Sequence, residues 1–405
     1  KEGHSNTMTT TATSTATLSL SAPVMAPLTA SSSSSSSGLG SSCPALERKS
    51  SECFCTEALE TMVCNSEAFV LSLITEASKL SQEDNHGSPA EYVPKAIAWI
   101  SVAEGKGQKL MDFCVRREIE HTSAPNLLLR EETSFTRAMS LFANLEGFLF
   151  LEDVVKPAVK TILSKKCSFE ITETKEPSHE ERVKNSEAVV KVMKAVLDGC
   201  LKNAKKLSQS FRQLFSELDA VTNEKFPEYG KKAAGVCFFL RFLCPNLVNP
   251  ELYGLVSAVP PEKRRRLIVI SQLLQQLVNC WSNDSLPLVS PDASTSEDLG
   301  PSIVAELLAR YAPKIDEFIT KHLLLPKKGK KSLASYMYWK DADAKVDQQA
   351  KMLYHFIMHN SSSILPHLSS HDCETLVASL EDAQNKSLKR SRPRAATVVK
   401  LVWAY

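Results

Sequence analysis

An arginine stands inside a strongly apolar stretch of this chain. Between Ala233 and Leu243 the only charged residue is Arg241, and the stretch is too short to span a membrane, which takes about 20 apolar residues. It therefore predicts a buried helix that is apolar on all sides. Because Pro245 disfavours helical geometry in the residue before it, the helix is expected to end near Cys244. A buried guanidinium is costly unless it is partnered, so we expect Arg241 to form an ion pair or to donate hydrogen bonds to backbone carbonyls.

A second arginine, Arg130, comes just before another predicted helix. Four apolar residues recur there at helical spacing, and Thr133 or Ser134 can cap the helix N-terminus. A cation is disfavoured beside a helix N-terminus, so local electrostatics gives no reason for Arg130. Two interpretations stay open, an ordinary solvated arginine and a functional one. The apolar residues are Phe135, Met139, Phe142 and Leu145.

Other catalytic chemistry is not indicated by the sequence. The nine histidines are dispersed, and no metal-ligand set, glycine-rich phosphate loop or nucleophile triad can be recognised. The eleven cysteines are scattered, which is typical of reduced thiols in a cytosolic protein. Cys53 and Cys55 lack a second ligand pair, so no zinc site is expected. We therefore expect no cofactor of the chain's own and no metal.

Composition indicates a globular protein with added segments. The 405 residues are 43% hydrophobic and 23% charged, and the net charge of +2 gives no global field that favours nucleic acid. Residues 1–51 are rich in Ser, Thr and Ala and are expected to be disordered. Helical periodicity follows, and strand patterns are weak. The chain starts at Lys1, so we expect a fragment or a processed form, without a recognisable secretory signal.

The apolar stretch resembles the signature of the Ras GTPase-activating domain family. That signature reads Phe-Leu-Arg, two or three apolar residues, Pro-Ala, an apolar pair, then Asn or Ser before Pro. Asn246 departs from it, because the family usually has alanine there. The matching residues are Phe239, Leu240, Arg241, Pro245, Asn249 and Pro250.

The segment around Arg130 is similar to the family's arginine-finger motif. The motif reads Leu-Phe-Arg, a short spacer, Ser or Thr, and a Thr-Lys pair that leads into a helix. Leu129 replaces the phenylalanine and Arg137 replaces the lysine, whereas Thr133 and Thr136 match. The resemblance covers residues from roughly 60 to 325.

The resemblance implies an all-α fold with an elongated helical domain of the family type (52–325). Composition and helical periodicity add a disordered segment (1–51) before it and a short helical extension with a basic tail (326–405) after it. The resemblance implies a GTPase activator that acts in trans and is not itself the hydrolase. Its partner is a Ras-like small GTPase in the GTP-bound state, which carries the GTP and magnesium. Arg130 is then the arginine finger, and Arg241 supports the finger loop.

The resemblance also implies partner-binding residues. Gln272 stands where many relatives have lysine, a change expected to weaken docking or shift partner preference. A non-catalytic GTPase-binding scaffold of the same fold is the alternative function, and a helical-repeat adaptor is disfavoured because no constant repeat period is found. The implied partner-binding residues are Leu129, Thr133, Thr136, Phe239, Leu240, Pro245, Asn249, Gln272 and Asn279.

Three basic clusters, at 263–266, 326–331 and 386–394, bear on localisation. Each could contact anionic lipid, at about 1 kcal/mol per charge, or could simply be solvated. We expect a cytoplasmic protein with no nucleic-acid partner. Two interpretations of the basic clusters stay open, weak contact with the inner face of the plasma membrane and a purely solvated surface.

Overall fold

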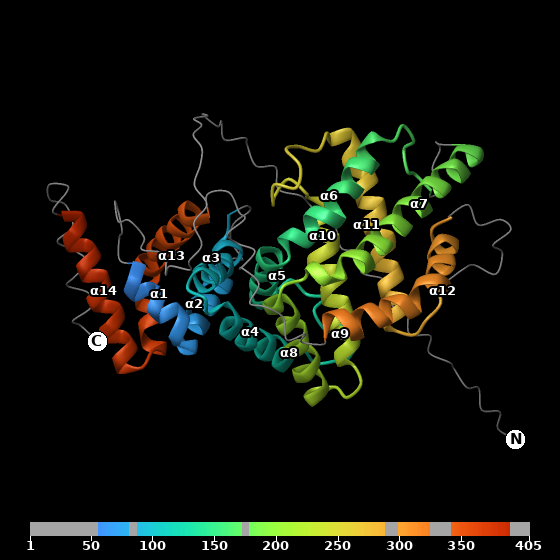
Figure 1. Cartoon of the computed structure of the whole chain (residues 1–405). Helices are drawn as coiled ribbons and strands as arrows, with labels where there is room; N and C mark the ends of the chain where they lie inside the picture. The colour runs from blue at the N-terminus through green and yellow to red at the C-terminus, as the bar shows by residue number, and fades with distance from the viewer. Residues whose placement is uncertain (1–55, 81–86, 172–177, 288–298, 325–341, 389–405) are drawn as a thin grey trace, which may run out of the picture. The chain divides into compact units, whose positions relative to one another are not determined.

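The computed structural model describes residues 56–80, 87–171, 178–287, 299–324 and 342–388. Within these ranges all regular structure is helical and no strand occurs (Figure 1), which confirms the predicted all-α fold class. The segment predicted to be disordered, the basic residues 326–331, the pair Cys53 and Cys55, and residues 389–405 of the basic tail lie outside the described ranges.

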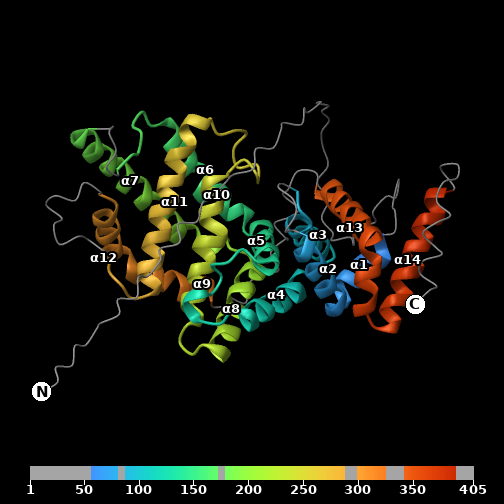
Figure 2. The ribbon, with the colours of Figure 1, turned by 180° about the vertical axis from the view of Figure 1, so that it is seen from behind.

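The first helices of the described chain pack with the last ones. α1 (Thr56–Asn65), α2 (Glu67–Lys79) and α3 (Pro89–Ala103) contact α13 (Ala342–Ile364), and α14 (Ser370–Leu388) contacts α1. Both views show these helices side by side (Figures 1 and 2). The buried residues of α13 that join this core are Val346, Ala350, Leu353, Phe356 and Ile357.

The remaining helices form the part of the fold that contains Arg241, and α5, α9, α10 and α11 contact its apolar stretch directly. α4 packs on α5 and α8, α6 on α7, and α11 on α10 and α12. These helices are α4 (Gly107–His121), α5 (Ser134–Glu146), α6 (Phe148–Ser164), α7 (His179–Asn203), α8 (Gln209–Lys225), α9 (Gly230–Val236), α10 (Cys244–Val248), α11 (Pro261–Ser282) and α12 (Gly300–Phe318).

The apolar stretch is the aromatic centre of this part of the fold. Phe238 is fully buried, and six other phenylalanine rings lie 5.1–6.3 Å from its centroid, within the range of favourable ring contacts. These rings are mostly edge-on or tilted, as the quadrupole of an aromatic ring favours. The predicted burial is confirmed, except that Leu240 and Arg241 remain partly exposed. The six rings belong to Phe150, Phe211, Phe215, Phe239, Phe242 and Phe318.

The expected helix end near Cys244 is wrong. Cys244 is helical (φ −64°, ψ −43°), and the helix continues through α10 to Val248. The physical reason is a π-helical segment over Cys237–Leu243, in which the Cys244 N–H donates to the Phe239 carbonyl five residues back. This wider turn lets Pro245 occupy the first turn of α10, where its missing N–H costs little.

The packing of α13 on α3 predicts that residues far beyond the apolar centre stabilise the fold. Leu353→Ala removes a fully buried side chain from this contact and should lower the free energy of unfolding by about 2–5 kcal/mol. Urea unfolding followed by far-UV circular dichroism measures the loss. Leu252→Ala, at a residue that is 57% exposed, is the control and should change it by less than about 0.5 kcal/mol. Equal losses in the two variants would contradict the packing.

Candidate functional site

Arg130 lies in the loop of residues 122–133 between α4 and α5, called the finger loop below. The loop includes a short 3₁₀ turn, Pro125–Leu127, and the Arg130 N–H donates to the Leu127 carbonyl at 3.2 Å. Leu129 has φ 57° although its side chain is completely buried. A branched side chain is disfavoured in this left-handed region, so the surrounding structure must hold the loop in this conformation.

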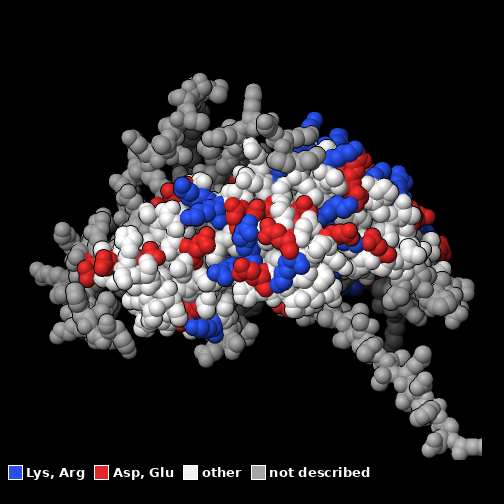
Figure 3. Space-filling view, turned by 90° about the horizontal axis from the view of Figure 1, so that it is seen from below, with Lys and Arg blue, Asp and Glu red and all other residues white. Residues whose placement is uncertain are grey.

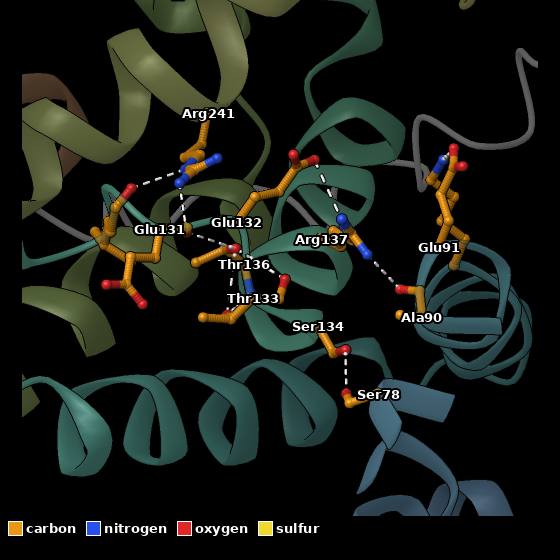
Figure 4. A network of polar contacts seen from close by, with 12 residues as sticks. Ser78, Ala90, Glu91, Glu131, Glu132, Thr133, Ser134, Thr136, Arg137 and Arg241 are labelled. Atoms are coloured by element: carbon orange, nitrogen blue, oxygen red, sulfur yellow. Dashed lines mark hydrogen bonds and ion pairs between the residues drawn. The ribbon is translucent and has the colours of Figure 1, made fainter. Parts of the chain in front are cut away.

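Hydrogen bonds from Arg241 stabilise the finger loop in this conformation. Its Nε donates to the Leu129 carbonyl at 2.8 Å, and its Nη2 donates to the Glu131 carbonyl. Figure 4 shows Arg241 extending from its helix toward Glu131. This is the second of the two arrangements expected for Arg241, hydrogen bonds to backbone carbonyls. The two acceptors flank Arg130, while no donor within the described residues pairs with the Arg130 carbonyl itself.

A buried carboxyl group fixes the other end of the finger loop. Thr133, one of the two predicted cap residues, caps α5 by accepting from the Thr136 N–H at 3.1 Å, and its hydroxyl donates to Glu118 at 2.5 Å. The Thr136 hydroxyl lies 3.3 Å from the Glu131 carbonyl (Figure 4). Burial raises the pKa of Glu118, and the hydrogen bond from Thr133 acts against that rise. The Thr136 hydroxyl has a closer acceptor in the Thr133 carbonyl, at 2.9 Å, so Arg241 is the principal donor to the Glu131 carbonyl.

Glu118 was not singled out from the sequence, although a signal for it exists. It follows Leu110 and Cys114 at intervals of four residues, so it falls on the face of α4 that those residues bury. A carboxylate on the apolar stripe of a helix needs a hydrogen-bond partner. The partner itself, Thr133, could not be inferred from this pattern.

Arg137 joins α5 both to α3 and to Glu132 of the finger loop. Its Nη1 donates to the Ala90 carbonyl at 2.7 Å, and its Nε lies 3.5 Å from the Glu132 carboxylate (Figure 4). The hydroxyls of Ser134 and Ser78 lie 3.1 Å apart and add a contact from α5 to α2. The helix that follows the finger loop is thereby attached to the neighbouring helices at its first turn.

The Arg130 side chain contacts the last turn of α11. Its Nη1 donates to Asn279 Oδ1 at 2.9 Å, and its Nε donates to the Asn126 carbonyl at 2.7 Å. Arg130 also borders a small surface hollow lined by Tyr229 and Lys232, among others. Partial burial lowers the pKa of Arg130, but an arginine remains charged at neutral pH. Two of the residues singled out in the sequence, Arg130 and Asn279, are thus in direct contact.

The structure places the other residues singled out from the sequence in three different settings. The side chains of Leu129, Thr136 and Phe239 are buried, so they can affect a partner only by shaping the surface. Thr133, Leu240 and Asn279 are partly exposed, and Gln272 and Pro245 are exposed. Asn249 accepts a hydrogen bond from Arg264 at 3.1 Å. Their roles in partner binding stay predictions.

Asn246, where the family usually has alanine, is a buried residue of α10. Its Nδ2 donates to Asn144 Oδ1 at 2.6 Å and to the Phe242 carbonyl at 2.7 Å. A buried amide requires such partners. Asn144 on α5 supplies the acceptor that an alanine would not need, so this departure from the signature joins α10 to α5.

The basic run at the start of α11 makes intramolecular contacts. Lys263 and Arg266 donate to backbone carbonyls at the end of α6, Arg265 pairs with Glu170, and Arg264 pairs with Glu251. These side chains attach the segments after α6 and α10 to α11. Binding of this run to anionic lipid would compete with these contacts.

The charge distribution on one face is mixed. In the view from below, Lys and Arg side chains lie interleaved with Asp and Glu over the described residues (Figure 3). None of the described helices is long and apolar enough to cross a bilayer. Among the residues placed by the structure, no group of three or more His, Cys, Asp or Glu could hold a metal ion.

Comparison with known proteins supports one class of protein for part of the chain. Residues 168–279 match the RasGAP family, described as "GTPase-activator protein for Ras-like GTPase". The match includes Arg241 and Asn279 but not Arg130. This match, together with relatives named as Ras GTPase-activating proteins, supports a RasGAP domain in this chain, as the sequence signature predicted.

Three relatives show how much of each protein is shared. The chain is 30% identical over 193 residues to "Probable Ras GTPase-activating-like protein ngap" of Dictyostelium discoideum, covering 47% of this chain and 22% of that protein. It is 29% identical over 171 residues to "Inhibitory regulator protein IRA2" of Saccharomyces cerevisiae, covering 42% and 6%. It is 29% identical over 172 residues to "Ras GTPase-activating protein gap-2" of Caenorhabditis elegans, covering 41% and 14%. The chain thus spans less than a quarter of each of these relatives.

The buried carboxyl group at the finger loop predicts a pH dependence of stability. Because the folded pKa of Glu118 is raised, the folded state binds this proton more tightly than the unfolded state does. The stability it contributes is present at low pH and is lost as pH rises through the raised pKa. The Gln side chain of Glu118→Gln cannot ionise, so this variant does not lose that stability. The melting temperature of the variant minus that of wild type should therefore be larger at about pH 8 than at about pH 5.

Differential scanning calorimetry at the two pH values measures this change. Glu120→Gln removes a carboxylate from the exposed side of the same helix and is the matched control, which should follow wild type. A Glu118→Gln difference that stays constant with pH would show that the carboxyl group does not titrate as its burial demands.

Proposed function

We propose that this chain is a GTPase-activating protein, which stimulates GTP hydrolysis by a Ras-type small GTPase and supplies Arg130 in trans as an arginine finger. One observation carries the proposal. Arg241 donates to the carbonyls on both sides of Arg130, so the backbone that presents this one side chain is fixed from a buried helix. The family match and the names of the relatives support the same activity.

The chemistry explains why such a fixed arginine matters. GTP hydrolysis spreads negative charge over the transferred phosphoryl group and the bond to its leaving group. A guanidinium placed against that charge stabilises the transition state. Such a finger contributes about 10³–10⁵ in rate in GTPase–activator pairs, for which the Ras pair is the type example. Lysine is a poor substitute because it lacks the planar fork of donors.

The environment of Arg130 suits this task. Its two hydrogen-bond acceptors, the Asn279 amide and the Asn126 carbonyl, are both neutral, so the guanidinium keeps its positive charge. The Arg130 carbonyl has no donor among the described residues, which leaves it available to position the catalytic glutamine of the GTPase. GTP and magnesium belong to the partner in this scheme, and the chain brings no cofactor of its own.

Arg130→Ala should abolish stimulation of hydrolysis, by a factor of about 10³ or more, because it removes the charge that faces the phosphoryl group. Affinity for the GTP-bound partner should change by less than about threefold, since the side chain truncation leaves the docking surface in place. Single-turnover hydrolysis with Ras, Rap and Rho proteins, together with pull-downs of each in its GDP and GTP forms, measures both quantities.

Arg310→Ala, at an exposed arginine of α12, is the control and should behave as wild type. If Arg130→Ala stimulated hydrolysis as fast as wild type, the finger assignment would be wrong. If wild type bound a GTP-loaded GTPase without stimulating it, the non-catalytic scaffold would replace the activator as the function.

Arg241→Ala should reduce the stimulated rate by about 10- to 100-fold, because it removes hydrogen bonds from a charged donor to the finger loop but not the reacting charge. The Arg130→Ala, Arg241→Ala double variant should be no slower than Arg130→Ala alone, since both changes act on one unit. Additive losses would mean that Arg241 acts independently of the finger loop. The same single-turnover assay decides between these results.

A further inference from the structure

The Arg130 guanidinium is already engaged in the free protein, and its partner is a residue of a distant helix. Its Nη1 donates to Asn279 Oδ1 at 2.9 Å across 149 residues of sequence. Asn279 is itself firmly placed, because its carbonyl accepts from the Asn283 N–H at 3.1 Å and from the Ser282 hydroxyl at 3.2 Å. The contact therefore joins a long flexible side chain to a fixed point.

The position of Asn279 favours a cation. It lies in the last turn of α11, which ends at Ser282, and the final carbonyls of a helix carry partial negative charge. No acidic residue occurs in that turn, whose sequence is Asn279-Cys280-Trp281-Ser282. The attraction comes from dipoles alone, which hold a guanidinium without cancelling its charge.

We propose that Asn279 is a positioning residue that acts through Arg130, holding the guanidinium beside the small surface hollow lined by Tyr229 and Lys232 in a form that the GTP-bound partner can displace. This inference rests on the proposed function and assigns Asn279 a role inside the activator rather than a direct contact with the GTPase. A neutral amide suits the role because a carboxylate at the same place would form an ion pair with Arg130, which adds a charge–charge attraction to the hydrogen bond.

Two substitutions separate holding from partner contact. Asn279→Ala removes the acceptor, and Asn279→Asp replaces it by a charged one of nearly the same shape. Gln276→Glu is the matched control, since it adds the same charge to an exposed position of α11 that has no described contact with Arg130. Each variant is measured for single-turnover hydrolysis at saturating activator, for affinity to the GTP-bound GTPase, and for the arginine side-chain ¹⁵N spectrum of the free protein.

We expect Asn279→Asp to lower the saturated rate on the order of tenfold, because the pair must break before Arg130 reaches the phosphoryl group. Asn279→Ala should lower the saturated rate by about three- to fivefold, because the unheld Arg130 side chain loses more conformational freedom on reaching the phosphoryl group. It should also shift the Arg130 signal, which Arg130→Lys identifies by its loss. Gln276→Glu should alter neither the saturated rate nor that signal. Affinity should change by less than about threefold in Asn279→Ala, because the GTPase does not depend on this amide.

Two results would overturn the inference. One is an unchanged Arg130 signal in Asn279→Ala, which would mean that the contact does not hold the side chain in solution. The other is a loss of affinity in both Asn279 variants with normal saturated rates, which would make Asn279 a contact to the GTPase. Measuring Arg130→Ala in the same assays distinguishes failure of this positioning role from failure of the proposed function. If Arg130→Ala is inactive and Asn279→Asp is as fast as wild type, only the positioning role is lost.

Discussion

A charged guanidinium that leaves water must find hydrogen-bond acceptors, and in this protein the acceptors for Arg241 are the carbonyls of Leu129 and Glu131. The requirement works in both directions. Arg241 is stabilised inside an apolar helix, and the finger loop is held in a conformation that places a buried leucine at positive φ. One interaction therefore satisfies a buried charge and fixes the residue between the two acceptors.

The helix that carries Arg241 can do this because its other faces are packed with aromatic rings. Phe238 and Phe242 are buried among rings from α6, α8 and α12, so the helix cannot rotate without disrupting this core. The π-helical turn contributes as well, since it carries the helix past Pro245. π-turns are frequent at functional sites, and here the turn spans Arg241 itself.

The charged groups around the finger loop have two different roles. The carboxyl group of Glu118 is buried and holds the cap residue Thr133, while Arg130 meets only neutral acceptors. A carboxylate paired with Arg130 would neutralise the charge that the proposed chemistry uses, whereas one paired with a hydroxyl does not affect it. The acidic group therefore fixes the loop from one side, and the arginine remains charged on the other.

The sequence alone determined the helical class, the family signature around Arg241 and the capping of α5 by either Thr133 or Ser134, because each depends on local periodicity or on short fixed spacings. It also limited Arg241 to an ion pair or backbone carbonyls. Only the tertiary structure decided which carbonyls these are, that Asn279 meets Arg130, and that Glu118 holds Thr133. It also decided that the helix continues past Pro245. These contacts join residues far apart in the chain or depend on how a turn is wound, and hydrophobic patterning does not specify either.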